Sequence, residues 1–262
     1  MSYNTVTFEV ADNVATVTLN RPNDANALNL EMAQEMLDIA IRCGSDPGVR
    51  AVLITATGKM FCAGGDLKEM EAQGDAKHQH LTRMAGDLHA ALIRFQHNDA
   101  PVVMAVNGTA AGGGLSMMLS GDYIISSDKA RFVSAYTAAG LTPDGSSTFF
   151  LAKYIGLLRA KELVLTNRML SAEEALDWGM VNKVVPGEEL MDEARKVAAM
   201  FAAGPTKAYG GAKALLLGAY NTSIEAQLEA ETRGIAGMML TKDGQTGLNA
   251  FINKEKPAFE GR

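Results

Sequence analysis

The sequence has few cysteines, few aromatic residues and no long apolar run. Its 262 residues include two cysteines and one tryptophan, and aromatic residues make up 6% of the chain. Cys43 and Cys62 stand in unrelated patterns, so we expect two reduced thiols in a cytoplasmic protein. Neither a signal-peptide pattern nor the roughly 18 consecutive apolar residues of a membrane span is present. We therefore expect no membrane partner.

An excess of positive charge is also missing. The chain has 24 Lys and Arg residues against 30 Asp and Glu residues, which gives a net charge of −6 at pH 7. Without a dense row of basic side chains, nucleic acid is not expected as a partner. The composition, 47% hydrophobic and 21% charged, is that of an ordinary globular protein. The length is enough for one large core.

Short apolar runs separated by helical patterns predict an α/β fold. Residues 6–10 and 15–19 alternate in polarity around a turn at Asp12 and Asn13, which predicts a hairpin. Runs that suit strands buried on both faces cover residues 51–55, 102–106 and 122–126. Helical spacing begins after Asn29, recurs over about 80–97, and begins again at about 115. Beyond about residue 145 helical patterns dominate, so we predict an α/β core over 1–200 and a helical region over 201–262.

Two glycine-rich turns are the main functional signal. They are residues 61–67 (FCAGGDL) and 107–115 (NGTAAGGGL), and each leads from an apolar run into a helical pattern. Glycine lets backbone N–H groups face a ligand with no side chain in the way. One donor from each turn could converge on a developing oxyanion. Neither turn has dinucleotide-binding or P-loop spacing.

With further motifs, the two turns resemble the crotonase (enoyl-CoA hydratase/isomerase) superfamily. These motifs are residues 20–22 (NRP), 26–28 (NAL), 131–136 (RFVSAY), 140–145 (GLTPDG), 165–168 (LTNR), 175–181 (ALDWGMV) and 250–254 (AFINK). The series covers nearly the whole chain. The resemblance implies a ββα spiral core, a helical C-terminal region that assembles homotrimers or hexamers, and an acyl-CoA substrate. It also implies an oxyanion hole made of the Gly65 and Gly113 N–H groups.

The same resemblance locates the acid–base residues. Hydratases of the family use two glutamates, but the matching positions hold Ser116 and Tyr136, so ordinary hydration of an enoyl-CoA is not expected. Asp144 stands where isomerases of phenylacetate breakdown keep a proton-shuttling aspartate and where 4-chlorobenzoyl-CoA dehalogenase keeps its nucleophile. Apolar neighbours in the sequence predict a raised pKa for Asp144. The alternative role is to cap the helix that follows.

His89 keeps a second chemistry open. It falls where the dehalogenases have their histidine base, twelve residues before Pro101. The tryptophan that accompanies this base in dehalogenases is replaced by Tyr136, which weakens the match. A single histidine in an apolar helical pattern is also typical of a helix face. His89 is therefore either a catalytic base or a residue that lines the site.

Binding of coenzyme A is expected to need few side chains. The resemblance places candidate substrate-binding residues at Ala63, Asp66, Leu67, Ser116, Tyr136, Phe251 and Lys254, with Phe251 and Lys254 reaching the neighbouring subunit. Arg21 and Lys68 are further candidates for phosphate contacts. Coenzyme A enters as part of the substrate thioester, so no separate cofactor is expected. His78 and His80 lack a third ligand and are predicted to lie in a solvated surface loop, with no metal site.

The favoured function is isomerisation of an enoyl-CoA double bond, in which Asp144 moves the proton and Gly65 and Gly113 hold the thioester oxygen. One alternative is hydrolase or dehalogenase-like activity on an aromatic or branched acyl-CoA, using Asp144 and His89. Another is a protein classed with the enoyl-CoA hydratases that lacks their glutamate pair. A third is a non-catalytic CoA-binding protein, since fold does not fix function.

Overall fold

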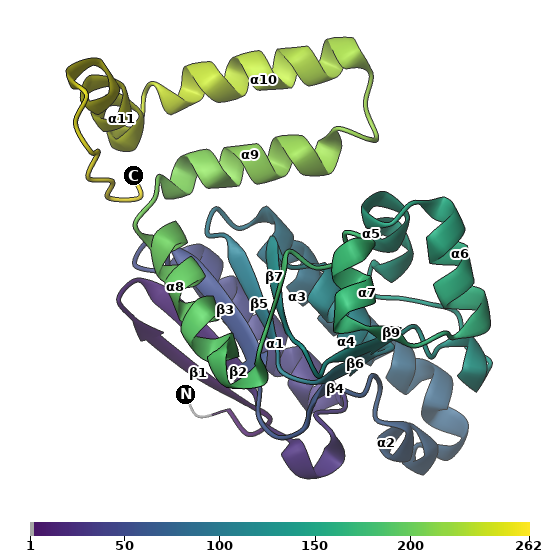
Figure 1. The fold of residues 1–262 in the computed structure, drawn as a ribbon. Coiled ribbons are helices and arrows are strands. Elements are labelled where there is room, and N and C mark those ends of the chain that lie inside the picture. The colour runs from purple at the N-terminus through teal and green to yellow at the C-terminus, as the bar shows by residue number, and fades with distance from the viewer. Residues whose placement is uncertain (1–2) are drawn as a thin grey trace.

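The computed structural model describes residues 3–262 and contains two β-sheets with helices packed around them (Figure 1). The six-stranded sheet, in the order β1-β2-β3-β5-β7-β10, consists of Val6–Ala11, Val14–Leu19, Ala51–Ala56, Val102–Val106, Tyr123–Ser127 and Lys183–Val185. The four-stranded sheet, in the order β4-β6-β8-β9, consists of Met60–Cys62, Thr109–Ala111, Arg131–Val133 and Leu170–Ser171. Among the strands of residues 3–262, β1–β2 and β8–β9 pair antiparallel and the other pairs are parallel.

The helices are α1 Leu30–Ser45, α2 Leu67–Ala72, α3 Lys77–His97, α4 Gly113–Leu119, α5 Ser147–Tyr154, α6 Leu157–Thr166, α7 Ala172–Asp177, α8 Leu190–Ala202, α9 Thr206–Gly218, α10 Ile224–Met238 and α11 Lys242–Asn253. Short 3₁₀ turns cover Pro22–Asp24, Gly74–Ala76, Thr137–Ala139 and Gly187–Glu189. None of the helices in the described residues is both long and apolar enough to cross a membrane.

The N-terminal hairpin confirms the prediction. β1 and β2 pair in register from Val6–Leu19 to Ala11–Val14, with Asp12 and Asn13 as a two-residue loop. Both loop residues have positive φ, 50° and 64°. A tight hairpin turn of this kind requires positive φ at both central positions, and Asp and Asn tolerate it.

The central strands are buried on both faces, as their continuous apolar runs predict. Side chains alternate along a strand, so Val52 and Ile54 of β3 lie in a different core cluster from Leu53. The first cluster receives α1 and α3, which pack against each other. The second cluster receives α8, which covers β3 and β5 on the opposite face.

The expectation that strands end near residue 145 is wrong. β9 and β10 lie beyond it, and they pair with β8 and β7 respectively. β9 has two residues and β10 has three, so neither is long enough to produce a periodic signal. The helix expected from about 115 begins at Gly113, inside the glycine turn.

Three helices end the chain and extend away from the sheets, with α10 running alongside α9 (Figure 1). These helices and the turn between α10 and α11 expose large apolar side chains: Leu216, Leu228, Ile235, Leu240, Leu248, Phe251 and Ile252. Arg50, which is buried before β3, anchors the region. Its Nη2 donates to the carbonyl oxygens of Gly204 at 2.7 Å and Phe259 at 3.1 Å.

The small sheet brings the two glycine turns together. β4 and β6 pair in parallel, so their C-terminal ends lie side by side and the first turn faces the second. A Cβ atom on Gly64 would lie 3.1 Å from the Ala111 carbonyl oxygen and 3.4 Å from the Gly113 nitrogen. Gly64 also has a φ of 96°. A side chain there is therefore disfavoured by both the crowding and the backbone conformation.

Candidate active site

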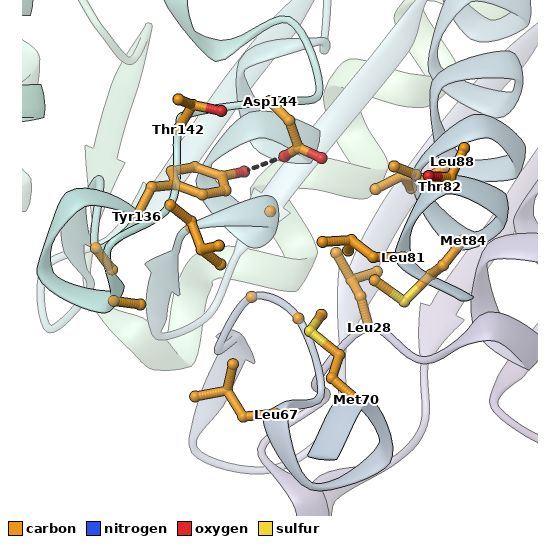
Figure 2. A pocket seen from close by; sticks show the side chains of 18 of the residues that line it. Leu28, Leu67, Met70, Leu81, Thr82, Met84, Leu88, Tyr136, Thr142 and Asp144 are labelled. Atoms are coloured by element: carbon orange, nitrogen blue, oxygen red, sulfur yellow. Dashed lines mark hydrogen bonds between the residues drawn. The ribbon is translucent and has the colours of Figure 1, made fainter. Parts of the chain in front are cut away.

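A cavity of about 410 Å³ opens where the two turns meet α3 and the loop that carries Asp144 (Figure 2). Its walls are mostly apolar side chains: Leu28, Leu67, Met70, Leu81, Met84 and Leu88. Gly64, Gly65, Gly112 and Gly113 contribute backbone only. Asp144 is the only carboxylate among the described residues that line the cavity. A mostly apolar pocket with few polar groups is typical of a small-molecule site.

The N–H groups of Gly65 and Gly113 have no acceptor within residues 3–262. Gly65 lies opposite Leu28 in an isolated bridge. The hydrogen bonds of this bridge join Leu28 to the backbone of Gly64 and Asp66, so they do not use the Gly65 N–H. Gly113 is the first residue of α4, where N–H groups lack an intrahelical partner. The cavity therefore has two free backbone donors, one from each turn.

The carboxylate of Asp144 is held by two side chains. Tyr136 Oη donates to Asp144 Oδ1 at 2.6 Å (Figure 2), and His89 Nε2 lies 3.3 Å from Oδ2. The alternative role as a helix cap is wrong, since α5 begins at Ser147 and has no side-chain cap. Only the backbone carbonyl of Asp144 takes part there, and it accepts from Ser147 N at 3.1 Å.

The expected rise in the pKa of Asp144 is also wrong. Burial does raise this pKa, but hydrogen bonds from His89 and Tyr136 and the charge of His89 outweigh it and hold the pKa below its ordinary value of 3.8. The apolar neighbours in the sequence could not reveal these two donors. Asp144 is therefore an ionised carboxylate at neutral pH.

His89 projects from α3 with 47% of its side chain exposed. Its Nε2 accepts from Gly145 N–H at 3.1 Å when the ring is neutral, and faces Asp144 Oδ2 when it is protonated. The hydrogen bond and charge of Asp144 raise the pKa of His89 above 6.5, although burial acts against them. The protonated ring is thus the form that Asp144 stabilises.

Ser116 and Tyr136 occupy one hydrogen-bonded group with Asp144. Ser116 Oγ is buried and lies 2.8 Å from the Tyr136 hydroxyl and 2.9 Å from the Asp144 carbonyl oxygen. Burial and the nearby charge of Asp144 raise the pKa of Tyr136. Its hydroxyl therefore stays protonated and donates. Ser116 and Tyr136, which stand where hydratases of the family have glutamates, therefore donate hydrogen bonds to Asp144, Ser116 to its carbonyl oxygen and Tyr136 to its carboxylate.

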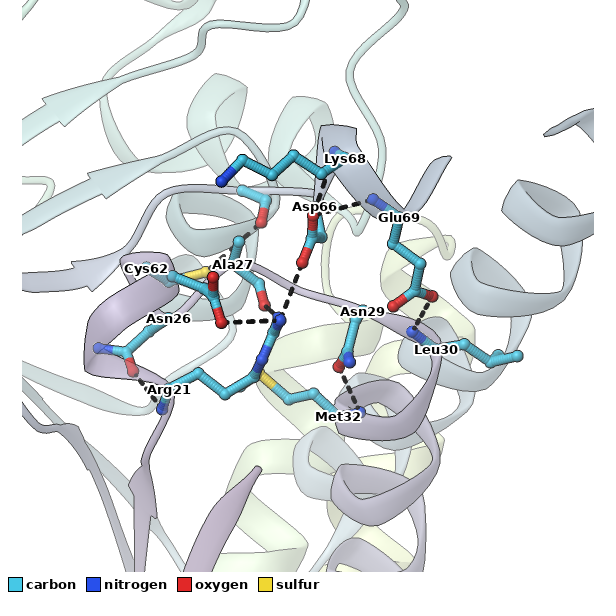
Figure 3. A network of polar contacts seen from close by, with 12 residues as sticks. Arg21, Asn26, Ala27, Asn29, Leu30, Met32, Cys62, Asp66, Lys68 and Glu69 are labelled. Atoms are coloured by element: carbon cyan, nitrogen blue, oxygen red, sulfur yellow. Dashed lines mark hydrogen bonds and ion pairs between the residues drawn. The ribbon is translucent and has the colours of Figure 1, made fainter. Parts of the chain in front are cut away.

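The polar residues of the first turn bind each other (Figure 3). Asp66 Oδ1 caps α2 by accepting from the N–H groups of Lys68 and Glu69, and its Oδ2 lies 2.9 Å from Arg21 Nη2. Arg21 Nη1 donates to the Ala27 carbonyl oxygen at 2.6 Å. Both charged groups are thus engaged within the protein, while Ala63 and Leu67 line the cavity.

The structure separates some predicted residues from the cavity. Phe251 and Lys254 lie at the end of α11, and Phe251 is 86% exposed. The loop predicted at His78 and His80 is wrong, because both belong to α3, but His78 is exposed as predicted. His78 lines the cavity, and His80 Nε2 lies 2.8 Å from Glu69 Oε1 with 11% of its side chain exposed. Helix spacing counted back from Leu88 would have placed Leu81 and Met84 on the cavity face.

Comparisons with known proteins agree with this geometry. The model of the enoyl-CoA hydratase/isomerase family matches residues 9–262. The chain is 35% identical to 1,2-epoxyphenylacetyl-CoA isomerase of Escherichia coli strain K12, with 97% of each chain covered. It is 34% identical to 4-chlorobenzoyl coenzyme A dehalogenase-2 of an Arthrobacter species, covering 95% of this chain and 91% of the relative. A crystal structure of an enoyl-CoA hydratase/isomerase from Mycobacterium abscessus superposes with a TM-score of 0.92 at 34% identity, over 98% of this chain and 100% of the other.

The site and fold are those of an acyl-CoA enzyme. The chain belongs to the enoyl-CoA hydratase/isomerase family, and the expected crotonase fold is confirmed.

The Asp144–His89 pair predicts how His89 titrates. Replacing Asp144 by Asn removes the negative charge and turns one carboxylate oxygen into an NH2 donor, which weakens both effects that raise the pKa of His89, but it leaves the burial of His89, so this pKa should fall. NMR titration of the histidine ring protons in wild type and Asp144→Asn measures the change. Glu173→Gln, at an exposed position of α7, is the control and should leave the His89 titration unchanged. Equal titrations in all three proteins would contradict the pairing.

The pair also sets a pH window for its contribution to stability. The pKa of folded His89 is raised, so its contribution is complete below pH 6.5 and is lost as the pH rises through the raised value. The pKa of folded Asp144 is lowered, so its contribution is complete above pH 3.8 and is lost as the pH falls through the lowered value.

Proposed function

We propose that the protein moves the double bond of an enoyl-CoA thioester between the 3,4 and 2,3 positions. The observation that carries the proposal is an ionised Asp144 in a cavity with two free backbone N–H groups and no second carboxylate. A hydratase of this family needs carboxylates to activate water. Ser116 and Tyr136 stand in their place and cannot act as such bases.

The reaction needs one base and one oxyanion site. The thioester oxygen accepts hydrogen bonds from Gly65 and Gly113, which stabilise the negative charge when a C2 proton leaves. Asp144 takes that proton on its carboxylate, and the electron pair of the C2–H bond becomes the enolate. The proton then returns to C4 as the double bond settles between C2 and C3, so Asp144 ends as it began.

The hydrogen bonds to Asp144 fit this cycle. Tyr136 donates to Oδ1 and fixes the plane of the carboxylate, which leaves Oδ2 for the transferred proton. His89 beside Oδ2 keeps the carboxylate ionised before the substrate binds. The apolar wall formed by residues of α3 keeps bulk water from the enolate.

The coenzyme A portion is proposed to lie along the first turn, against the backbone of Ala63, Asp66 and Leu67. Lys68 at the start of α2 is the better candidate for a phosphate contact, since Arg21 is engaged by Asp66 and Ala27. The chain is also proposed to form homotrimers or hexamers. The apolar side chains exposed on the C-terminal helices support this, and Phe251 and Lys254 would then reach a neighbouring subunit's coenzyme A.

The second candidate function is attack by Asp144 on the acyl group, with His89 as the base for water. The 3.3 Å approach of His89 Nε2 to Asp144 Oδ2 favours it. The substrate would be an aromatic or branched acyl-CoA, and the product would arise by hydrolysis or loss of a halide. The reaction would place one oxygen of water on Asp144, which isomerisation never does.

Asp144→Asn should reduce the isomerisation rate by about 10²–10⁴-fold, because the base is lost while the cavity keeps its shape. The measurement is interconversion of 3-hexenoyl-CoA and 2-hexenoyl-CoA in deuterated water, followed by mass spectrometry. Wild type should exchange deuterium and form no 3-hydroxyacyl product. Asp87→Asn on α3, outside the cavity lining, is the matched control. Full activity in Asp144→Asn would refute the proton shuttle.

His89→Gln separates the two candidate functions. In the isomerase it removes only a partner of Asp144, so the rate should change by less than about tenfold, below the usual effect of losing an acid or base. In the hydrolytic mechanism it removes the base. The wild-type enzyme is also taken through a single turnover in ¹⁸O-labelled water, and the mass of the peptide containing Asp144 is measured. Isomerisation should leave this peptide without ¹⁸O. Incorporation of ¹⁸O at Asp144 would refute isomerisation and support the second candidate function.

The assembly is tested by sedimentation equilibrium at micromolar concentration. The expected mass is three or six times the 27.8 kDa of one chain, because burial of the exposed apolar residues of α10 and α11 favours association. A single-chain mass at that concentration would rule out the proposed homotrimer or hexamer.

A further inference from the structure

A second cavity, also of about 410 Å³, lies directly behind His89. His89 is on the wall of both cavities, so the two adjoin at this residue. The second cavity lies between α3, the start of α5, and α9. Its lining is mainly apolar and includes Leu92, Ile93, Phe149 and Leu217. An apolar chain that leaves Asp144 in this direction would find a lined path.

The path continues into a third cavity of about 300 Å³. The second and third cavities share Gln96, Phe149, Phe150 and Leu217 in their walls, so they adjoin, and the two together are called the channel below. Phe149 and Phe150 form its wall in an edge-to-face pair with centroids 5.2 Å apart. The third cavity also has charged side chains in its wall, namely Asp122, Lys153 and Lys213.

The far end of the channel carries one uncompensated positive charge. Lys213 Nζ lies 2.7 Å from Asp122 Oδ2 and also donates to the carbonyl oxygens of Phe95 and Ala100, so this pair is neutral and saturated. Lys153 has no carboxylate or hydrogen-bond acceptor among residues 3–262. Its Nζ lies over the rings of Phe149, at 3.5 Å, and Tyr220, at 4.7 Å.

The length of the channel fits a long acyl chain. Between Ser147, the first residue of α5, and Lys153 the helix advances about 9 Å at its rise of 1.5 Å per residue. An extended hydrocarbon covers that distance with about seven bonds of roughly 1.5 Å in a zigzag. With the carbons that Asp144 reaches and those that pass Gly145 and Ser146 ahead of the helix, the acyl group would have about twelve to fourteen carbons.

We propose that the substrate is a long-chain acyl-CoA with a carboxylate at its far end, which pairs with Lys153. The assignment of which end reacts rests on the function proposed above, but the channel and its cation do not. The apolar wall binds the methylene groups, and the carboxylate meets a cation that is already held by two aromatic rings. A chain ending in a methyl group would leave Lys153 unpaired.

The test is binding of saturated, unreactive thioesters, so it does not depend on isomerase activity. Calorimetry compares tetradecanoyl-CoA with the mono-CoA thioester of tetradecanedioic acid, in wild type and in Lys153→Met. The methionine keeps an apolar stem against Phe149. The substitution should weaken the carboxylate ligand about fivefold, as for a partly exposed ion pair, and leave the methyl-ended ligand unchanged. Lys161→Met on α6, outside the channel lining, should affect neither ligand.

A second variant tests the channel. Leu217→Trp narrows the part shared by the second and third cavities, so both long ligands should bind about tenfold more weakly while hexanoyl-CoA binds as before. Equal effects of Lys153→Met on both long ligands, or undiminished binding of them to Leu217→Trp, would overturn the proposal. Failure of 3-tetradecenoyl-CoA to isomerise, although tetradecanoyl-CoA binds, would instead count against the proposed function alone.

Discussion

The parallel pairing of β4 with β6 is the constraint on which the site depends. These strands are only three residues long, yet their ends bring together two turns that are almost fifty residues apart in the chain. Gly64 sits against the backbone of Ala111, Gly112 and Gly113, so a side chain at position 64 would crowd the second turn. The free N–H groups of Gly65 and Gly113 therefore have positions fixed by backbone contacts, and substrate binding need not assemble them.

The proposed chemistry depends on the side chains around Asp144. Tyr136 and Ser116 form a hydrogen-bonded group with Asp144 where the resemblance to hydratases places acids. Donors keep one carboxylate ionised, whereas two more carboxylates would repel it and raise its pKa. An ionised, single carboxylate suits a proton that leaves one carbon and returns to another. It suits the two-carboxylate activation of water poorly.

Sequence patterns predicted the layers of the fold and the two turns, because buried strands and glycine clusters leave local signals. The hairpin follows from alternating polarity around Asp12 and Asn13, and the double-faced burial of β3 and β5 follows from their continuous apolar runs. The electrostatics of the site could not be predicted in the same way. His89 lies 55 residues from Asp144, and their contact, which reverses the expected pKa shift, depends on how α3 crosses the Asp144 loop. β9 and β10 were missed since strands of two or three residues have no period.

Gly108 and Gly114 limit which positions of this scaffold can be substituted. A Cβ atom at Gly108 would lie 2.0 Å from the Lys59 carbonyl oxygen, and one at Gly114 would lie 2.4 Å from that of Cys62. Neither glycine is among the residues that line the cavity, yet both are steric requirements of the strand crossing. Tyr136 and Asp144 are under no such backbone restriction, because their side chains line the cavity, whereas Ser116 is fully buried against Gly145. An engineer who seeks a new reaction could vary positions 136 and 144 and leave every glycine of the crossing in place.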